Sequence, residues 1–213
     1  MQKPGEPGCV LLPMRCVLLP ARSSAPFTGL PISARSFRGG SFYCPATRVR
    51  RADKTNQGTL MKVYFLRHGD AAWPDWDQPD TQRPLNKKGK KEMRRVAKFL
   101  AGIGVAPDVI LSSPLPRAVQ TAAIAAAAMG LEVMEEASLT PGFDEQKLAA
   151  ILSAHNEQDI LLVGHEPDFS GAIEMLTGGT IKMAKAGCAR VDVDETSRRG
   201  QLIWLLPPKI SAR

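Results

Sequence analysis

The chain has 213 residues and a formal net charge of +7, a length that allows one domain with a hydrophobic core and an additional tail. The charge is uneven: residues 1–60 contain nine Lys or Arg against two Asp or Glu, whereas residues 61–213 contain 19 of each sign. The globular part is therefore neutral, which argues against non-specific nucleic-acid binding by the domain. No apolar run reaches the ~18 residues of a membrane span, so we expect a soluble chain.

Residues 1–60 are rich in Pro, Gly, Ser and Arg and lack sustained helical or strand periodicity. Such a segment cannot bury enough apolar surface to fold alone, so we expect a disordered basic extension. Three interpretations stay open: a transit peptide, a mis-assigned translation start, because Met61 directly precedes the first expected strand, or a functional arm. We expect a cytoplasmic location, or an organelle if the extension is a transit peptide.

Only one of the four cysteines, Cys188, lies beyond the extension. A single cysteine cannot form an internal disulfide, and no pair has the spacing of metal ligands. The cysteine pattern therefore fits a reducing compartment.

Two apolar runs end in histidine. Residues 62–66 predict a buried strand that stops at Arg67, His68 and Gly69, and residues 159–163 predict another that stops before His165. In open α/β sheets the ligand crevice lies at the carboxyl ends of the strands. If the two strands are parallel, both imidazoles lie at one edge, whereas the third histidine, His155, falls at a polar helix end.

Residues 70–85 predict an irregular loop, followed by a helix with Asn86 as its N-cap and Gly104 at its close. Its apolar positions are Met93, Val96, Ala97, Leu100 and Ile103. Its basic positions, which form a solvated face or a substrate-steering patch, are Lys87, Lys88, Lys90, Lys91, Arg94 and Arg95.

Residues 108–111 predict a short buried strand, and the next helix is expected to have Ser113 as N-cap and Pro114 as its first residue. This helix should run past Arg117 to Met129 and stop at Gly130. The remaining expected elements are a strand at 132–139, a helix capped by Asp144 with Leu148, Ile151 and Leu152 on one face, a helix opened by Pro167 and Asp168 and stopped by Gly178, and a hairpin of 189–193 with 202–206. Alternating strands and helices predict a three-layer α/β sandwich with a largely parallel central sheet flanked by helices.

Arg117 is expected in the first turn of a helix that follows a strand. Helix N-termini attract phosphate, and an arginine there adds a fork that matches phosphate oxygens. Together with Arg67, His68 and His165, it would place four cationic or hydrogen-bonding groups at three strand ends. Such a site fits a dianion, and a nucleophilic imidazole would make it a site of phosphoryl transfer.

These residues resemble the histidine phosphatase, or phosphoglycerate mutase-like, superfamily, and within it most closely the compact SixA-like phosphohistidine phosphatases. The resemblance covers roughly residues 61–207. It is carried by Arg67-His68-Gly69-Asp70-Ala71, Arg83-Pro84-Leu85, Asn86-Lys87-Lys88-Gly89, Ser112-Ser113-Pro114 with Arg117 and Thr121, Leu139-Thr140-Pro141, and Gly164-His165.

The resemblance implies that His68 attacks phosphorus in line and becomes phosphohistidine, which water then hydrolyses. It also implies that Arg67, Arg117 and His165 bind the phosphoryl oxygens and that Arg83 is a further arginine of the phosphate pocket. No metal and no organic cofactor are expected.

The larger family members protonate their leaving group with a carboxylic acid, for which no convincing match exists here; Asp70, Asp144 and Glu166 are the candidates. The loops that roof the pocket of mutases are also short or missing. An open pocket without a strong acid suits a good leaving group on a large substrate, such as imidazole with its free pKa of ~6.5. We therefore expect a monomeric phosphatase that acts on phosphohistidine in a protein of the histidine-phosphotransfer type.

Three alternatives stay open. The first is a small-molecule phosphomonoesterase on the same scaffold, and the second is a non-catalytic phosphate- or phosphoprotein-binding module. The third, a two-histidine metal site, ranks last because no motif supplies a third ligand.

Overall fold

A computed structural model describes residues 60–74, 76–156, 158–194 and 197–212 of the chain. The predicted disorder of the extension lies outside these residues, apart from Leu60. This residue already belongs to the first strand, where it pairs with Asp194.

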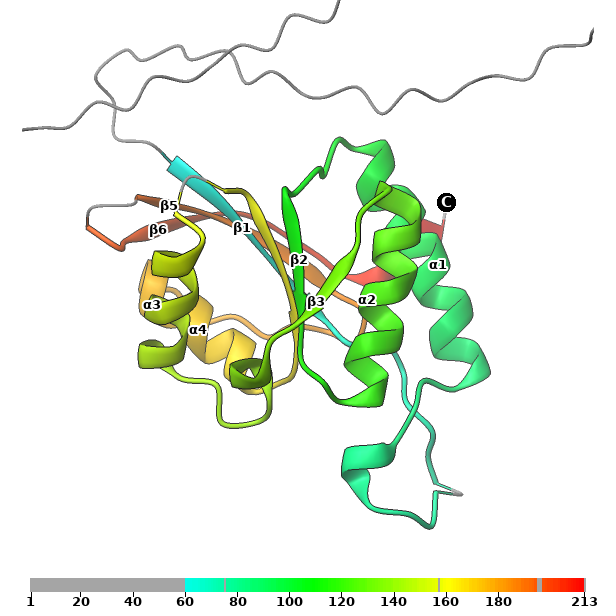
Figure 1. The fold of residues 1–213 in the computed structure, drawn as a ribbon. Helices are drawn as coiled ribbons and strands as arrows, with labels where there is room; N and C mark the ends of the chain where they lie inside the picture. The colour runs from blue at the N-terminus through cyan, green and yellow to red at the C-terminus, as the bar shows by residue number, and fades with distance from the viewer. Residues whose placement is uncertain (1–59, 75, 157, 195–196, 213) are drawn as a thin grey trace, which may run out of the picture. The chain divides into compact units, whose positions relative to one another are not determined.

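The strands of the described residues form one six-stranded sheet in the order β3-β2-β4-β1-β5-β6 (Figure 1). Strand β5 is antiparallel to both of its neighbours, and the other pairings are parallel. The prediction of a largely parallel sheet is therefore confirmed. The strands are β1 (Leu60–Arg67), β2 (Val109–Ser112), β3 (Val133–Glu135), β4 (Ile160–Gly164), β5 (Cys188–Asp194) and β6 (Gly200–Leu206).

Helices cover both faces of the sheet, which makes the predicted sandwich (Figure 1). Helices α1 and α2 pack on one face, and α3 and α4 pack on the other. The α-helices are α1 (Lys87–Gly102), α2 (Pro116–Met129), α3 (Glu145–Ala154) and α4 (Asp168–Thr177), and the short 3-10 helices are η1 (Asp80–Gln82), η2 (Ala137–Leu139) and η3 (Pro208–Ala212). No helix among the described residues is long and apolar enough to span a membrane.

Several helix ends confirm their sequence signals. The Asn86 side chain accepts a hydrogen bond from the Gly89 amide at 2.7 Å, and Asp144 accepts one from the Lys147 amide at 3.0 Å. Gly130 and Gly178 end α2 and α4 in the left-handed conformation, where glycine has no steric cost.

Two local predictions are wrong. The strand expected at 132–139 is only three residues long, because the chain turns into η2 after Glu136, whose side chain accepts from the Ser138 amide. Helix α2 begins two residues later than expected, with Leu115 as N-cap and Pro116 as first residue. Pro116 meets the same first-turn preference as Pro114.

The core is divided by the sheet into two apolar clusters, one under each helix pair. Phe65 of β1 and Phe169 of α4 meet edge to face, with ring centroids 5.3 Å apart. A Cβ at Gly164 would lie 2.6 Å from the Phe169 ring, so glycine is needed for the close approach of α4 to the end of β4. This packing places His165, the next residue, beside the end of β1.

Candidate active site

The two predicted strand-end histidines lie together. Strands β1 and β4 are parallel with Arg67 opposite Gly164, and the His68 amide donates to the Gly164 carbonyl at 3.0 Å. The two imidazole centroids are 5.1 Å apart, and both side chains are buried. The expectation that both imidazoles share one sheet edge is confirmed, whereas His155 lies at the end of α3 and bonds to Gln158.

The surroundings of His68 determine its tautomer. Its Nδ1 lies 2.8 Å from the carbonyl oxygen of Gly69, and because a carbonyl can only accept, Nδ1 must carry the proton. Burial lowers the pKa of His68 to about 4; the Gly69 contact raises the pKa, and the charges of Arg117, Arg67 and Arg83 lower it. At neutral pH the ring is therefore uncharged, and Nε2 has a free lone pair.

His165 is held by Ser113, which the sequence predicts as the N-cap of α2. Its Nε2 lies 2.9 Å from the hydroxyl of Ser113. Burial, followed by the charges of His68 and Arg117, lowers the pKa of His165 to about 3. If the neutral ring accepts the Ser113 hydroxyl proton at Nε2, Nδ1 becomes a donor, and this buried atom has no partner within the protein.

Arg67 and Arg117 come from the last residue of β1 and the second residue of α2. Arg67 donates through Nη1 to the Met183 carbonyl at 2.7 Å, and Arg117 donates through Nη1 to the Asp80 carbonyl at 2.8 Å. Burial lowers the pKa of both guanidinium groups. Thr121 fastens α2 to the edge of the site, because its hydroxyl accepts from the Gly69 amide and donates to the Arg117 carbonyl.

Arg83, whose position was hard to predict, lies in the loop between β1 and α1. Its Nη2 is 2.7 Å from a carboxylate oxygen of Asp80, and its guanidinium carbon is 6.0 Å from the centre of the Trp73 ring. Its charge acts on both His68 and Arg117. The structure therefore brings Arg83 into the same group as the four sheet-edge residues.

The arginines and His165 of the site have buried nitrogen atoms without hydrogen-bond partners. Among the described residues, four buried side-chain polar atoms have no hydrogen-bond partner within the protein: Arg67 Nε, Arg83 Nε, Arg117 Nε and His165 Nδ1. An unpaired buried donor costs about 1–3 kcal/mol, more if charged, so such groups require an explanation. All four belong to residues that the sequence assigned to a phosphate pocket, and together they can donate to the oxygens of a bound anion.

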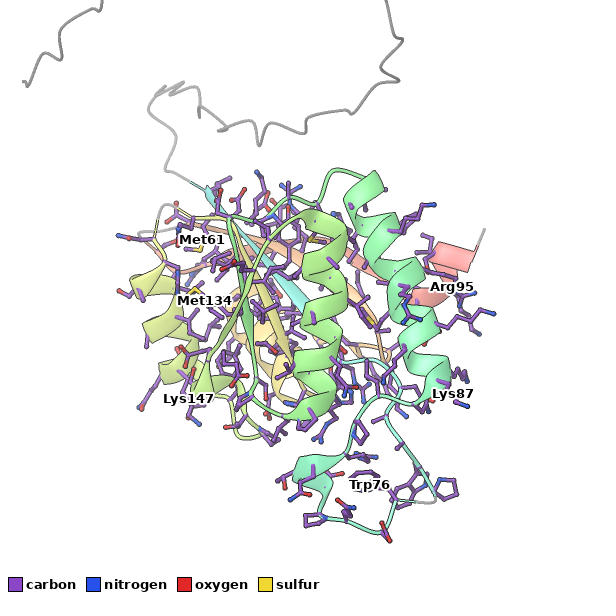
Figure 2. The ribbon with its side chains drawn as sticks, turned by 45° about the vertical axis from the view of Figure 1, so that its right-hand side comes forward. Met61, Trp76, Lys87, Arg95, Met134 and Lys147 are labelled. Carbon is purple, nitrogen blue, oxygen red and sulfur yellow. The ribbon has the colours of Figure 1, made fainter. Side chains whose placement is uncertain are left out.

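The loop that carries Arg83 extends from the carboxyl end of the sheet, the end at which α1 begins (Figure 2). In this view the labelled Trp76 lies far out on the loop, and Lys87 marks the start of α1. The cationic residues of α1 point outward from its buried face, as the labelled Arg95 shows. They form the predicted solvated face of α1.

Asp80 is the site residue that sequence reasoning missed. Its carboxylate contacts Arg83 at 2.7 Å and Arg117 at 3.1 Å. Its spacing of three from Arg83 could have suggested an ion pair, but nothing in the sequence links it to Arg117, 37 positions away.

The three acid candidates all have structural partners. Asp70 pairs with Lys185 at 2.7 Å and accepts from Asn86, and these contacts, Lys185 first, lower its pKa, so it is ionised at neutral pH. Glu166 accepts from the Ser170 hydroxyl, and Asp144 caps α3. Within the described part of the chain, no group of three His, Cys, Asp or Glu side chains has the arrangement of a metal site.

Comparisons with known proteins identify the family of the chain. A family model described as Histidine phosphatase superfamily (branch 1) matches residues 63–148. The phosphohistidine phosphatase SixA of Escherichia coli (strain K12) is 33% identical over 157 residues, which cover 70% of this chain and 94% of SixA. An uncharacterized chloroplastic protein of Arabidopsis thaliana is 27% identical over 190 residues, which cover 84% of this chain and 81% of that protein.

Among solved structures, the protein histidine phosphatase SixA complexed with tungstate matches with a TM-score of 0.65 and 32% identity, over 70% of this chain and 99% of that one. Sequence, fold and relatives thus indicate an enzyme of the phosphatase or mutase class. The chain belongs to the histidine phosphatase superfamily and is similar to its SixA members.

Proposed function

We propose that this protein is a phosphohistidine phosphatase, which removes the phosphoryl group from histidine in a protein through a covalent intermediate on His68. One observation carries the proposal: the proton-free Nε2 of His68 shares a buried site with unpaired donors from three arginines and His165. A neutral nucleophile and an unsatisfied set of cationic donors are the two parts that phosphoryl transfer requires.

In the first step, Nε2 of His68 attacks phosphorus opposite the leaving nitrogen. The new N–P bond forms as the P–N bond of the substrate breaks, and the departing imidazole takes a proton from water. The Nδ1 hydrogen bond to the Gly69 carbonyl persists and stabilises the positive charge on the His68 ring. In the second step, water attacks phosphorus as the bond from phosphorus to His68 Nε2 breaks. Inorganic phosphate leaves, the proton released by the attacking water replaces the one that solvent gave to the imidazole, and His68 is restored.

The donors around His68 stabilise the phosphoryl oxygens during both steps. Arg67 and Arg117 come from regular elements and keep their charge at any physiological pH. His165 donates through Nδ1 while Ser113 holds its other nitrogen. Because these groups are in place before the substrate arrives, little reorganisation is needed when charge develops.

The leaving group is the basis for proposing a phosphohistidine substrate. Asp70 is held ionised by Lys185, which makes it unsuitable as a proton donor. Imidazole, with a free pKa of ~6.5, leaves phosphorus with far less protonation than an alkoxide requires. The similarity to SixA, itself named a phosphohistidine phosphatase, supports the same choice. We propose a protein of the histidine-phosphotransfer type as the partner, because an open pocket suits a large substrate.

A substrate panel tests the proposal. Phosphate release from a phosphohistidine peptide should exceed release from alkyl and sugar phosphates, and esters of acidic phenols should be intermediate. Rapid quenching should also trap acid-labile, base-stable phosphate on His68. A preference for sugar phosphates would instead identify a small-molecule phosphomonoesterase, and binding of phosphate without turnover would identify a binding module.

We also propose that residues 1–60 direct the protein to an organelle. The extension has the Arg- and Ser-rich, acid-poor composition of transit peptides. The match to the chloroplastic Arabidopsis protein covers 84% of the chain, which is more than residues 61–213 contain, so it reaches into the extension. A fluorescent protein fused behind residues 1–60 should enter an organelle; a diffuse cytoplasmic signal would contradict this.

A further inference from the structure

Asp80 joins two arginines that would otherwise repel each other. One carboxylate oxygen lies 2.7 Å from Arg83 Nη2, and the other lies 3.1 Å from Arg117 Nη2. The Asp80 backbone carbonyl accepts a further hydrogen bond from Arg117 Nη1 at 2.8 Å. The charge of Arg83 lowers the pKa of Arg117, whereas the charge of Asp80 raises it, as expected for a carboxylate between two guanidinium groups.

The three arginines of the site share one arrangement. In each, an oxygen of the protein occupies one or both terminal nitrogens: the Met183 carbonyl for Arg67, the carbonyl and carboxylate of Asp80 for Arg117, and the carboxylate of Asp80 for Arg83. In each, Nε is buried and unpaired. The anchoring oxygens thus hold the Nη end of every guanidinium and leave the Nε edge for another ligand.

We infer that Asp80 is a positioning residue, whose carboxylate aims Arg83 and Arg117 so that their Nε edges meet the phosphoryl group. This inference rests on the proposed phosphate site but assigns a role that the reaction itself does not require. Asp80 does not touch the reacting atoms; it acts through the two arginines. An arginine fork binds phosphate well only in the correct orientation, which explains why an anchor at its other end matters.

The loop around Asp80 is held by hydrogen bonds and an aromatic contact, which restrict the position of the Asp80 carboxylate. The Trp76 indole donates to the carbonyl of Pro79, the residue before Asp80, at 3.2 Å. The Arg83 amide donates to the Asp80 carbonyl at 3.2 Å, and the Trp73 ring lies beside the Arg83 guanidinium. These contacts restrict the loop and with it the carboxylate.

A rival role for Asp80 is that of a competitor, which occupies the arginines until phosphate displaces it. Its side chain is 62% exposed, so it could swing away. The arrangement of Arg67 argues against this role, because its anchor is a backbone carbonyl in a different segment, which no phosphate would replace. The two roles predict opposite effects of removing the carboxylate.

The test compares Asp80→Asn and Asp80→Ala with Asp77→Asn, a control that removes an exposed carboxylate from the same loop. Dissociation constants for inorganic phosphate and orthovanadate are measured by calorimetry, with kcat and KM for a chromogenic aryl phosphate. We expect both Asp80 variants to bind oxyanions about 10-fold more weakly and to lose about 10–100-fold in kcat/KM, because two forks lose their orientation. Asp77→Asn should stay within about twofold, and Asp80→Glu should recover part of the loss.

A double-mutant cycle shows whether Asp80 acts through its partners. Once Arg83→Met has removed one fork, Asp80→Asn should cost clearly less than it does in the wild type. Tighter oxyanion binding by Asp80→Asn would establish the competitor role instead, and wild-type values in both Asp80 variants, or strictly additive losses in the cycle, would overturn the inference. If the wild type binds oxyanions through Asp80 but leaves phosphohistidine peptides intact, only the proposed function fails; if it binds no oxyanion, both fail.

Discussion

The sheet edge and the loop between β1 and α1 contribute to the same site in different ways. His68, His165, Arg67 and Arg117 stand at strand ends or in the first turn of α2, so strand register and helix packing set their positions. Arg83 stands on a loop and is oriented mainly by side-chain contacts with Asp80 and Trp73. Regular structure fixes the backbone from which a side chain extends, whereas a loop residue needs neighbours that hold its backbone as well as its side chain. Substitutions in the two regions should therefore lower the activity by different factors.

The largest effect is expected from the nucleophile. His68→Ala should lower kcat on a phosphohistidine peptide by at least ~10³-fold, because no other group supplies the attacking nitrogen. Quenched reactions of this variant should contain no phosphoenzyme. His155→Ala is the matched control, since this histidine lies at the end of α3 and should leave turnover unchanged. Retention of a tenth of the activity by His68→Ala would rule out the covalent mechanism.

The same substitution at an arginine of each region, Arg117→Lys and Arg83→Lys, tests whether the two regions differ in rigidity. Arg117→Lys, on α2 and 4% exposed, should lower kcat/KM by roughly 100-fold, because a lysine cannot bind the Asp80 anchor and the phosphoryl group at once. Arg83→Lys, on the loop, should cost only about 10-fold, because a loop side chain can adjust. Equal losses, measured on one aryl phosphate, would show that the loop is held as firmly as the sheet edge.

The buried histidines of the sheet edge should make stability depend on pH. Their pKa values fall from 6.5 to about 4 for His68 and to about 3 for His165 on folding, so below about pH 6.5 the unfolded chain binds more protons than the folded one. The free energy of unfolding should therefore be greatest above pH 6.5 and decrease from there toward pH 4, by up to about 1.4 kcal/mol per pH unit for each histidine.

Urea unfolding in acetate and neutral buffers measures this slope. His68→Gln should make it shallower, because one of the two histidines with a lowered pKa is then absent. A slope that is the same in the wild type and His68→Gln would mean that this imidazole is not held neutral by the fold. Because His68 stays uncharged down to about pH 4, its titration should also not limit kcat/KM above pH 5.

The smallest effect on activity is expected from removal of residues 1–60, which lie outside both regions. Every residue placed in the site lies beyond Met61, and the extension has no apolar periodicity with which to pack on the domain. A shortened chain that begins at Met61 should match the full chain in melting temperature and in turnover of an aryl phosphate. A decrease of several degrees would show that residues 1–60 pack on the domain. A loss confined to protein substrates, and sensitive to salt, would identify the extension as a docking arm.

Several helix ends and the two central strands could be predicted from the sequence alone. Asn86 and Asp144 cap their helices as predicted, and Gly130 and Gly178 end theirs, because caps and left-handed turns depend on a few neighbouring residues. The apolar runs before Arg67 and His165 predicted the two central strands for the same reason. The pattern predicted that His68 and His165 would share one sheet edge if their strands were parallel, and the parallel pairing of β1 with β4 confirms this.

Where two local solutions competed, or where partners are distant in sequence, only the tertiary structure decided. Pro114 and Pro116 both suit a first helical position, and in the structure the helix begins at Pro116, while the Ser113 hydroxyl contacts His165. Asp80 and Arg117 meet across 37 positions because the loop brings Asp80 to the side chain of the second residue of α2. Neither contact has a sequence signature, since a hydrogen bond between distant residues depends on the path of the whole chain and not on the residues near it.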